Sequence, residues 1–187
     1  VLNRPGGNVA LDNVKVLSTV GQQPSPEPEK LSEENELASL NIELGAYVTR
    51  AQAVYVLVSG LGDELKAVKP ADLSVFSDSS EIEPIYQKSL GLAVSLGAVN
   101  GSDDGKLHGN DYITRVEAFA IVSRVLSQDD LPTDLGDGES FFNDIPDWAV
   151  PDICRLKNAG LILGYGDGTL GSDDFMTYEQ VLLVYSR

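Results

Sequence analysis

The sequence predicts a mainly α-helical protein built from three helix-loop-helix repeats. Short blocks recur at fixed spacing: residues 113–118 echo residues 48–53, which lie 65 positions earlier, and are echoed more weakly by residues 176–181, 63 positions later. Apolar residues within these segments also recur at helical spacing. Because a helix pair of this size cannot bury its apolar face alone, we expect the repeats to share one core with pseudo-threefold packing.

Composition limits the classes of function. The 187 residues carry 13 basic and 29 acidic side chains, a formal net charge of -16, and this field repels nucleic acids and anionic membranes. An anionic ligand would therefore need local positive groups. One cysteine, Cys154, and one histidine, His108, allow neither an intrachain disulfide nor a zinc cluster. We expect no cofactor, no nucleic-acid partner and no membrane insertion, since the longest purely apolar run, residues 53–58, is far shorter than the roughly 20 residues of a span.

The first 30 residues differ in composition from the rest. Residues 1–20 alternate apolar and polar positions in part, which predicts a short extended segment; it either ends a preceding domain or lies as an arm on the next one. Residues 21–30 contain three alternate prolines and predict a stiff linker. Because the chain begins at Val1, we expect a processed or excised piece of a longer protein, with a catalytic or binding domain possible before it.

After the linker, each repeat is expected to contain two helices. The predicted repeats span residues 31–75, 76–136 and 137–187. The predicted first helices cover about residues 32–40 and 83–96, and a third runs from the region of Trp148 to a stop at Gly160. The second helices begin at Thr49, Thr114 and Thr177, and the one that begins at Thr114 is expected to end at about residue 126. Each of these threonines is followed three residues later by Gln52, Glu117 or Gln180, which predicts a capping box.

Two arginines stand at an unfavourable place. Arg50 and Arg115 occupy the first helical position, where a cation faces the positive end of the helix dipole. Free first-turn amides together with an arginine form a site for a carboxylate or phosphate. A salt bridge to one of the many carboxylates of the chain is the alternative interpretation.

These features together resemble the S-layer homology domain over residues 31–187. The resemblance rests on the blocks Phe76-Ser77-Asp78 and Phe142-Asn143-Asp144, on Asp147-Trp148-Ala149, on the glycine-rich loop at residues 164–170, and on residues 113–118, which look like the family's Thr-Arg-Ala-Glu signature. The family implies a three-pronged fold and non-covalent attachment of exported proteins to bacterial cell walls. Its implied ligand is a secondary cell-wall polysaccharide, typically pyruvylated, which binds in grooves between repeats. A secreted protein of the cell wall or S-layer is expected.

The resemblance also implies site residues. Arg115 and Arg50 would hold the ketal carboxylate, and the other expected contacts are Thr114, Thr49, Glu117, Gln52, Asp78, Asp144, Trp148, Gly164, Asp167, Gly168 and Tyr178. Trp148 has a second interpretation as a core anchor of its helix. Tyr178 stands where the other repeats have arginine, and the first repeat lacks the Asp-Gly loop, so at most two grooves are expected to capture an anion.

Two other functions remain open at this stage. Residues 100–111 resemble a dockerin-like calcium loop, although His108 occupies a ligand position and no glutamate follows at the twelfth position. A purely structural role in surface-layer assembly is the other. We expect no enzyme activity, because the paired aspartates at 103–104 and 173–174 lie beside glycines in turns, where aspartate is favoured for local hydrogen bonding.

Overall fold

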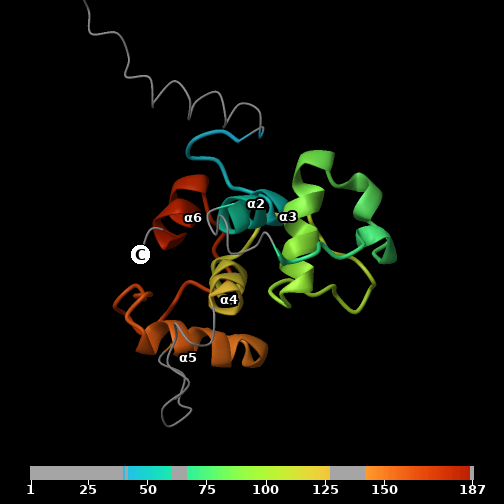
Figure 1. Ribbon diagram of the computed structural model, residues 1–187. Helices are drawn as coiled ribbons and strands as arrows, with labels where there is room; N and C mark the ends of the chain where they lie inside the picture. The colour runs from blue at the N-terminus through green and yellow to red at the C-terminus, as the bar shows by residue number, and fades with distance from the viewer. Residues whose placement is uncertain (1–39, 41, 60–66, 127–141, 186–187) are drawn as a thin grey trace, which may run out of the picture.

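The structure, a computed structural model, describes residues 40, 42–59, 67–126 and 142–185 (Figure 1). It is mainly helical, as predicted. The α-helices in this part of the chain are α2 (Arg50–Ser59), α3 (Pro84–Ser95), α4 (Arg115–Val125), α5 (Val150–Asn158) and α6 (Tyr178–Tyr185). Three short 3-10 helices accompany them: η2 (Leu73–Val75), η3 (Ser79–Glu81) and η4 (Asp147–Ala149). The predicted N-terminal segment, the linker and nearly all of the predicted helix at 32–40 lie outside the described residues.

The helices pack around α2 and α4. Figure 1 shows α2 at the centre with α3 on one side and α6 on the other, and α4 between α2 and α5. α2 contacts α3, α4 and α6, and α4 contacts α5 and α6. The first helix of each later repeat, α3 or α5, therefore packs chiefly on the second helix of the preceding repeat. Helices of neighbouring predicted repeats thus pack together in pairs.

A closed ring of three backbone hydrogen bonds joins the segments that lead into α2, α4 and α6. The Val48 amide donates to the Met176 carbonyl (3.0 Å), the Met176 amide to the Ile113 carbonyl (3.2 Å), and the Ile113 amide to the Val48 carbonyl (3.1 Å). All three side chains are buried. The ring satisfies polar backbone groups in the core and fixes the starts of three helices beside one another. The pseudo-threefold arrangement of three complete repeats stays a prediction.

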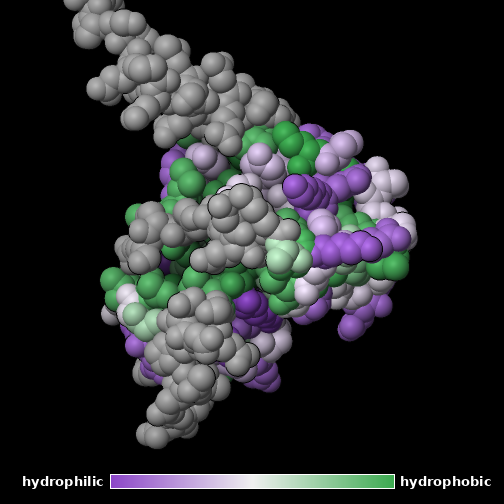
Figure 2. Space-filling model, in the orientation of Figure 1, coloured by the Kyte–Doolittle hydropathy of each residue, from purple (hydrophilic) through white to green (hydrophobic). Residues whose placement is uncertain are grey.

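An aromatic cluster lies beside this ring. Tyr47, Tyr112 and Phe175 each precede a ring residue, and their ring centroids are 5.5–5.9 Å apart. All three side chains are exposed. Figure 2 shows hydrophilic residues gathered on the side of the molecule where α3 and its neighbouring turns lie.

The helix starts follow the predicted capping chemistry. The Thr114 hydroxyl accepts from the Glu117 amide (3.4 Å), and a Glu117 carboxylate oxygen accepts from the Thr114 amide (3.0 Å). Thr49 and Gln52 make the same reciprocal pair. At α6 the Gln180 carbonyl oxygen accepts from the Thr177 amide (2.9 Å). The predicted helix limits hold to within one residue at α3 and α4.

We expect Thr114→Val to lower the free energy of unfolding by about 1 kcal/mol, because valine keeps the shape of threonine but removes the cap acceptor. Thermal and urea denaturation monitored by circular dichroism would measure the loss. A denaturation midpoint equal to that of the wild type would contradict the role of the cap in starting α4.

Candidate functional site

Two grooves open beside the arginines that begin α2 and α4. The Arg50 groove has a volume of about 550 Å³ and is lined by Arg50, residues 98–103, Glu117, Ala120, Ile121, Arg124 and Trp148. The Arg115 groove has a volume of about 250 Å³ and is lined by Arg115, Phe119, residues 161–163, Gln180, Leu183 and Val184. Most lining positions correspond at an offset of 63 to 65 residues. Both grooves therefore lie between equivalent parts of adjacent predicted repeats.

In the Arg115 groove the arginine has no carboxylate partner among the described residues. One Nη of Arg115 makes a long contact with the Leu163 carbonyl (3.4 Å), and its buried Nε has no hydrogen-bond acceptor there. The guanidinium carbon lies 4.9 Å from the Phe119 ring centroid and 5.3 Å from that of Tyr165. These rings hold the cation by cation–π attraction and leave its N–H donors available.

Asp174 organises this side of the groove. The Tyr165 hydroxyl donates to the Asp174 carboxylate (2.7 Å), and this hydrogen bond is the main cause that raises the pKa of Tyr165. The Asp174 carbonyl accepts from the Arg115 amide (2.8 Å). The residue thus positions both the backbone of the arginine and one of the rings beside it, while its carboxylate is occupied by the tyrosine.

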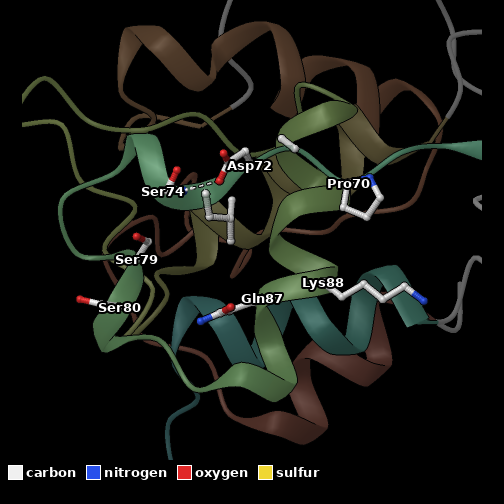
Figure 3. A pocket seen from close by; sticks show the side chains of 9 residues that line it. Pro70, Asp72, Ser74, Ser79, Ser80, Gln87 and Lys88 are labelled. Atoms are coloured by element: carbon white, nitrogen blue, oxygen red, sulfur yellow. Dashed lines mark hydrogen bonds between the residues drawn. The ribbon is translucent and has the colours of Figure 1, made fainter.

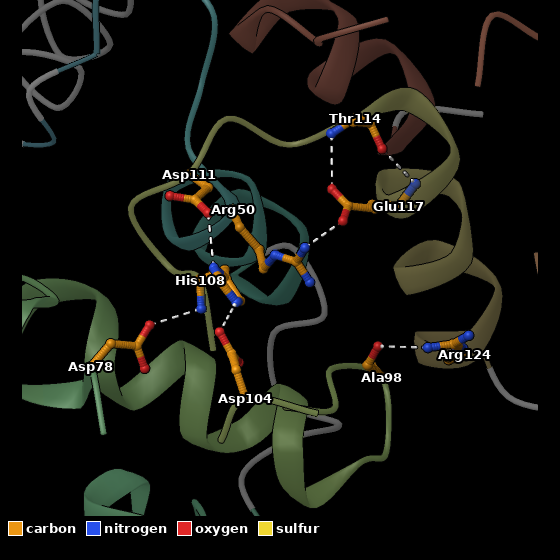
Figure 4. Close-up of polar contacts among 9 residues, drawn as sticks. All are labelled: Arg50, Asp78, Ala98, Asp104, His108, Asp111, Thr114, Glu117 and Arg124. Atoms are coloured by element: carbon orange, nitrogen blue, oxygen red, sulfur yellow. Dashed lines mark hydrogen bonds and ion pairs between the residues drawn. The ribbon is translucent and has the colours of Figure 1, made fainter. Parts of the chain in front are cut away.

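In the Arg50 groove the arginine is paired. One Nη of Arg50 forms a short ion pair with Glu117, and Figure 4 shows the other Glu117 oxygen turned back to the Thr114 amide. The alternative interpretation of this arginine, a salt bridge, is therefore the one that the structure has. The Nε of Arg50 is buried and has no partner among the described residues.

The far wall of the Arg50 groove carries Trp148 and Arg124. Trp148 lies in η4, just before α5, and its side chain is 51% exposed. Its interpretation as a core anchor is therefore wrong, and Ala149 and Ile153 are the buried residues there. The Arg124 guanidinium lies 5.9 Å from the Trp148 ring centroid and pairs with the buried Asp152 (2.8 Å). The ion pair holds Arg124 beside an indole ring whose surface is open.

Asp78 and Asp144 brace loops. The Asp144 carboxylate accepts from the amides of Leu170, Gly171 and Ser172, each at 2.8 Å. Burial acts to raise the pKa of Asp144, but these N–H donors outweigh it and the pKa falls below its usual value of 3.8.

Asp78 accepts likewise from Leu107 (2.9 Å) and His108 (2.8 Å), and its pKa is also lowered against the effect of burial. Neither aspartate is among the described residues that line the two grooves. Their carboxylates shape the loops next to the grooves.

Close packing around Gly164 and hydrogen bonds of Asp167 fix the shape of the predicted glycine-rich loop. A Cβ on Gly164 would lie 2.3 Å from the Phe142 ring and 2.4 Å from the Thr169 carbonyl, so only glycine fits. Gly168 has φ +91, a conformation that favours glycine. The Asp167 carboxylate accepts from the amide (2.9 Å) and the hydroxyl (2.6 Å) of Thr169. These residues form the turn, and residues 161–163 just before it line the Arg115 groove.

Two of the remaining predicted residues line another pocket, of about 280 Å³. Thr49 and Gln52 line it, together with Tyr47 and Tyr112. Tyr178 is half-buried against the core at the start of α6. The structure therefore groups Arg50 with Glu117 and Trp148, and places Arg115 in a separate groove with no other predicted contact.

In the loop at residues 100–111, which resembles a calcium site, His108 contacts two of the acidic side chains. His108 Nδ1 lies 2.9 Å from Asp111 and Nε2 lies 3.0 Å from Asp104 (Figure 4). The two carboxylates thus flank the ring on opposite edges. Within the described ranges, no group of three or more acidic, histidine or cysteine side chains has an arrangement suited to a metal ion.

A further pocket of about 450 Å³ lies on the outer side of α3 (Figure 3). Gln87 and Lys88 of α3 line it, with Asp72 and Ser74 at η2 and Ser79 at η3. The Asp72 carboxylate accepts from the Ser74 amide (2.9 Å). None of the predicted site residues lines this pocket.

Sequence reasoning missed most of the groove walls. Phe119, Leu163, Leu183 and Arg124 were not predicted as site residues, yet all line a groove. The repeat alignment finds part of them. An offset of 63 residues matches Leu163 with Asn100 and Leu183 with Ala120, and each pair places one residue in each groove. Phe119 and Arg124 have no such counterpart among the described lining residues.

Comparison with known proteins agrees with the resemblance. The S-layer homology domain family matches residues 75–119 and 142–182. The chain carries two S-layer homology motifs, one in each matched segment. The matched segments fall in the second and third predicted repeats, and the first repeat stays a prediction. S-layer homology domains are structural and binding domains rather than enzymes.

Two curated relatives are similar over 80 residues at 34% identity: "S-layer protein sap" of Bacillus anthracis and the "S-layer protein" of Bacillus thuringiensis subsp. finitimus. The stretch is 43% of this chain but only 10% and 9% of these relatives. The family and the relatives indicate a cell-surface, S-layer-associated protein. Of the helices in the described part of the chain, none combines the length and apolarity needed to cross a membrane.

We expect Asp144→Asn to lower the free energy of unfolding at pH 7 by about 1–3 kcal/mol, because three partly buried backbone amides lose their carboxylate acceptor. The folded pKa of Asp144 lies below its usual 3.8, so its contribution is complete above that pH and is lost as the pH falls through the folded pKa. The gap between variant and wild type should therefore narrow in acid. Urea denaturation at several pH values would measure it, with the exposed Asp173→Asn as the control; a gap that stays constant below pH 3.8 would contradict this role.

Proposed function

We propose that the chain anchors its protein to the bacterial cell wall by binding a pyruvylated wall polysaccharide. The observation that carries the proposal is Arg115, a cation in an apolar groove with no carboxylate partner among the described residues and with a buried Nε–H that has no acceptor there. Such a group favours an anionic ligand, and a guanidinium binds a carboxylate through charge-assisted hydrogen bonds.

The walls of the Arg115 groove support a ligand with both charge and apolar surface. Leu161, Leu163, Leu183 and Phe119 line it. A pyruvate ketal carries a carboxylate and a methyl group on one carbon, so the carboxylate would meet Arg115 while the methyl group meets apolar side chains. Because Arg115 is the one charged residue among the described lining residues, the groove is locally positive in a chain of net charge -16.

We also place a first S-layer homology repeat at residues 31–75, which gives three repeats with pseudo-threefold packing. The capped start of α2 supports it, because Thr49, Arg50 and Gln52 repeat the arrangement of Thr114, Arg115 and Glu117. The ring of backbone hydrogen bonds also supports this first repeat, because Val48, Ile113 and Met176 each donate one bond of the ring and accept another. The other domain limits, at residues 1–20, 21–30, 76–136 and 137–187, are proposed with it.

We expect Arg115→Ala to weaken binding to purified cell walls about 10- to 100-fold, which corresponds to one lost charge-assisted interaction of about 1.5–3 kcal/mol. The melting temperature should stay level or rise slightly, since the cation lies at the positive end of α4. Co-sedimentation with walls would measure binding. Lys88→Ala removes an equal charge from the exposed face of α3 and is the matched control.

The same assay separates the alternatives. Walls stripped of polysaccharide, and walls whose polysaccharide lacks pyruvate, should both bind the wild type poorly. Wild-type binding by Arg115→Ala would refute the anion site. Equal binding to stripped and intact walls would favour assembly of the protein with itself over polysaccharide anchoring.

A further inference from the structure

The two grooves are built from equivalent positions but differ in how their arginine is occupied. We propose that the third residue of the helix across each groove, Glu117 or Gln180, sets the charge of the ligand group that the groove accepts. Glu117 closes the Arg50 groove to carboxylates and leaves it to uncharged sugar groups, whereas Gln180 keeps the Arg115 groove open to a carboxylate. This inference rests on the proposed function.

Glu117 has two roles at once. One oxygen caps α4 by accepting from the Thr114 amide (3.0 Å), and the other pairs with Arg50. The cap holds the carboxylate in place, and the two side chains are only 17% and 25% exposed. A carboxylate that approached Arg50 would have to displace Glu117 or lie against it, and two like charges at that distance repel.

Gln180 makes the same capping hydrogen bond as Glu117, but the second polar atom of its side chain is a nitrogen and not an oxygen. Its carbonyl oxygen accepts from the Thr177 amide (2.9 Å). The side-chain atom left is an NH₂ group, which only donates. A guanidinium also only donates, so Gln180 cannot take the place on Arg115 that Glu117 takes on Arg50. The difference between an acid and an amide therefore decides whether the arginine is neutralised.

The other charges agree with this division. Among the described lining residues, the Arg50 groove has two cations, Arg50 and Arg124, and two anions, Asp103 and Glu117, whereas the Arg115 groove has Arg115 alone. Arg124 is further neutralised by Asp152. What the Arg50 groove still offers is a buried Nε–H donor and the exposed face of Trp148, which suit a hydroxyl or amide oxygen and the apolar face of a sugar ring.

Reciprocal exchange of the two residues tests the proposal. The probe is a methyl hexopyranoside carrying a 4,6-pyruvate ketal, and the same hexoside without the ketal is the comparison ligand. Isothermal titration of the whole chain gives affinity and stoichiometry together. We expect the wild type to bind the ketal at one site, Glu117→Gln to bind it at two, and Gln180→Glu to lose affinity by about 10- to 100-fold.

Both exchanges keep a cap acceptor, since glutamate and glutamine serve equally at this position. Glu179→Gln removes one negative charge from an exposed site on α6 and is the control for Glu117→Gln. Lys88→Ala shifts the net charge by the same amount on the exposed face of α3 and is the control for Gln180→Glu. Because Glu117→Gln is expected to gain a site, its result cannot arise from unfolding.

Arg115→Ala distinguishes failure of the proposed function from failure of the roles assigned to Glu117 and Gln180. If the wild type does not bind the ketal, or Arg115→Ala binds it as well as the wild type, the proposed function falls and this inference falls with it. If Arg115→Ala loses binding while Gln180→Glu keeps it and Glu117→Gln gains no second site, only the assignment of Glu117 and Gln180 is overturned.

Discussion

The ring of backbone hydrogen bonds through Val48, Ile113 and Met176 is the constraint on which the rest of the structure depends. It satisfies buried polar backbone groups that no helix or sheet would otherwise pair. It also sets three helix starts side by side, so each first-turn arginine emerges at a boundary between repeats. The Arg50 amide donates to the Asp111 carbonyl and the Arg115 amide to the Asp174 carbonyl, which joins each helix start to the loop of the next repeat. The grooves lie between the predicted repeats because the ring joins their helix starts at those places.

On this common frame, folding and recognition place different demands on one position. A capping box needs only an acceptor oxygen at the third helical residue, and both glutamate and glutamine supply it. The cap does not use the second polar atom of that side chain. This atom can therefore be an oxygen or a nitrogen without loss of the cap. In this chain it is a carboxylate oxygen at Glu117 and an amide nitrogen at Gln180. One groove is consequently neutral and the other positive within a strongly acidic protein.

The loops next to the grooves owe their shape to two aspartate carboxylates, one buried at Asp78 and one half-buried at Asp144. Asp144 takes three consecutive backbone N–H groups and Asp78 takes two. Leaving such groups without acceptors would cost roughly 1–3 kcal/mol each, so these aspartates are needed for the loop even without a ligand. The acidic residues that resemblance assigned to sugar contact thus have a structural role in forming the turns from which the groove walls extend.

The sequence by itself determined the features that depend on residues within about four positions of one another. The threonine caps, the limits of α3 and α4, and the stop at Gly160, whose φ is +72, follow from local hydrogen bonding and backbone sterics. The motif blocks within the repeats then carried the resemblance to the family. Tertiary structure alone decided that α3 packs on α2, that Trp148 is exposed, and that Glu117 pairs with Arg50 across 67 positions. Contacts of this kind depend on which distant segments the shared core brings together, and a local pattern carries no information about that choice.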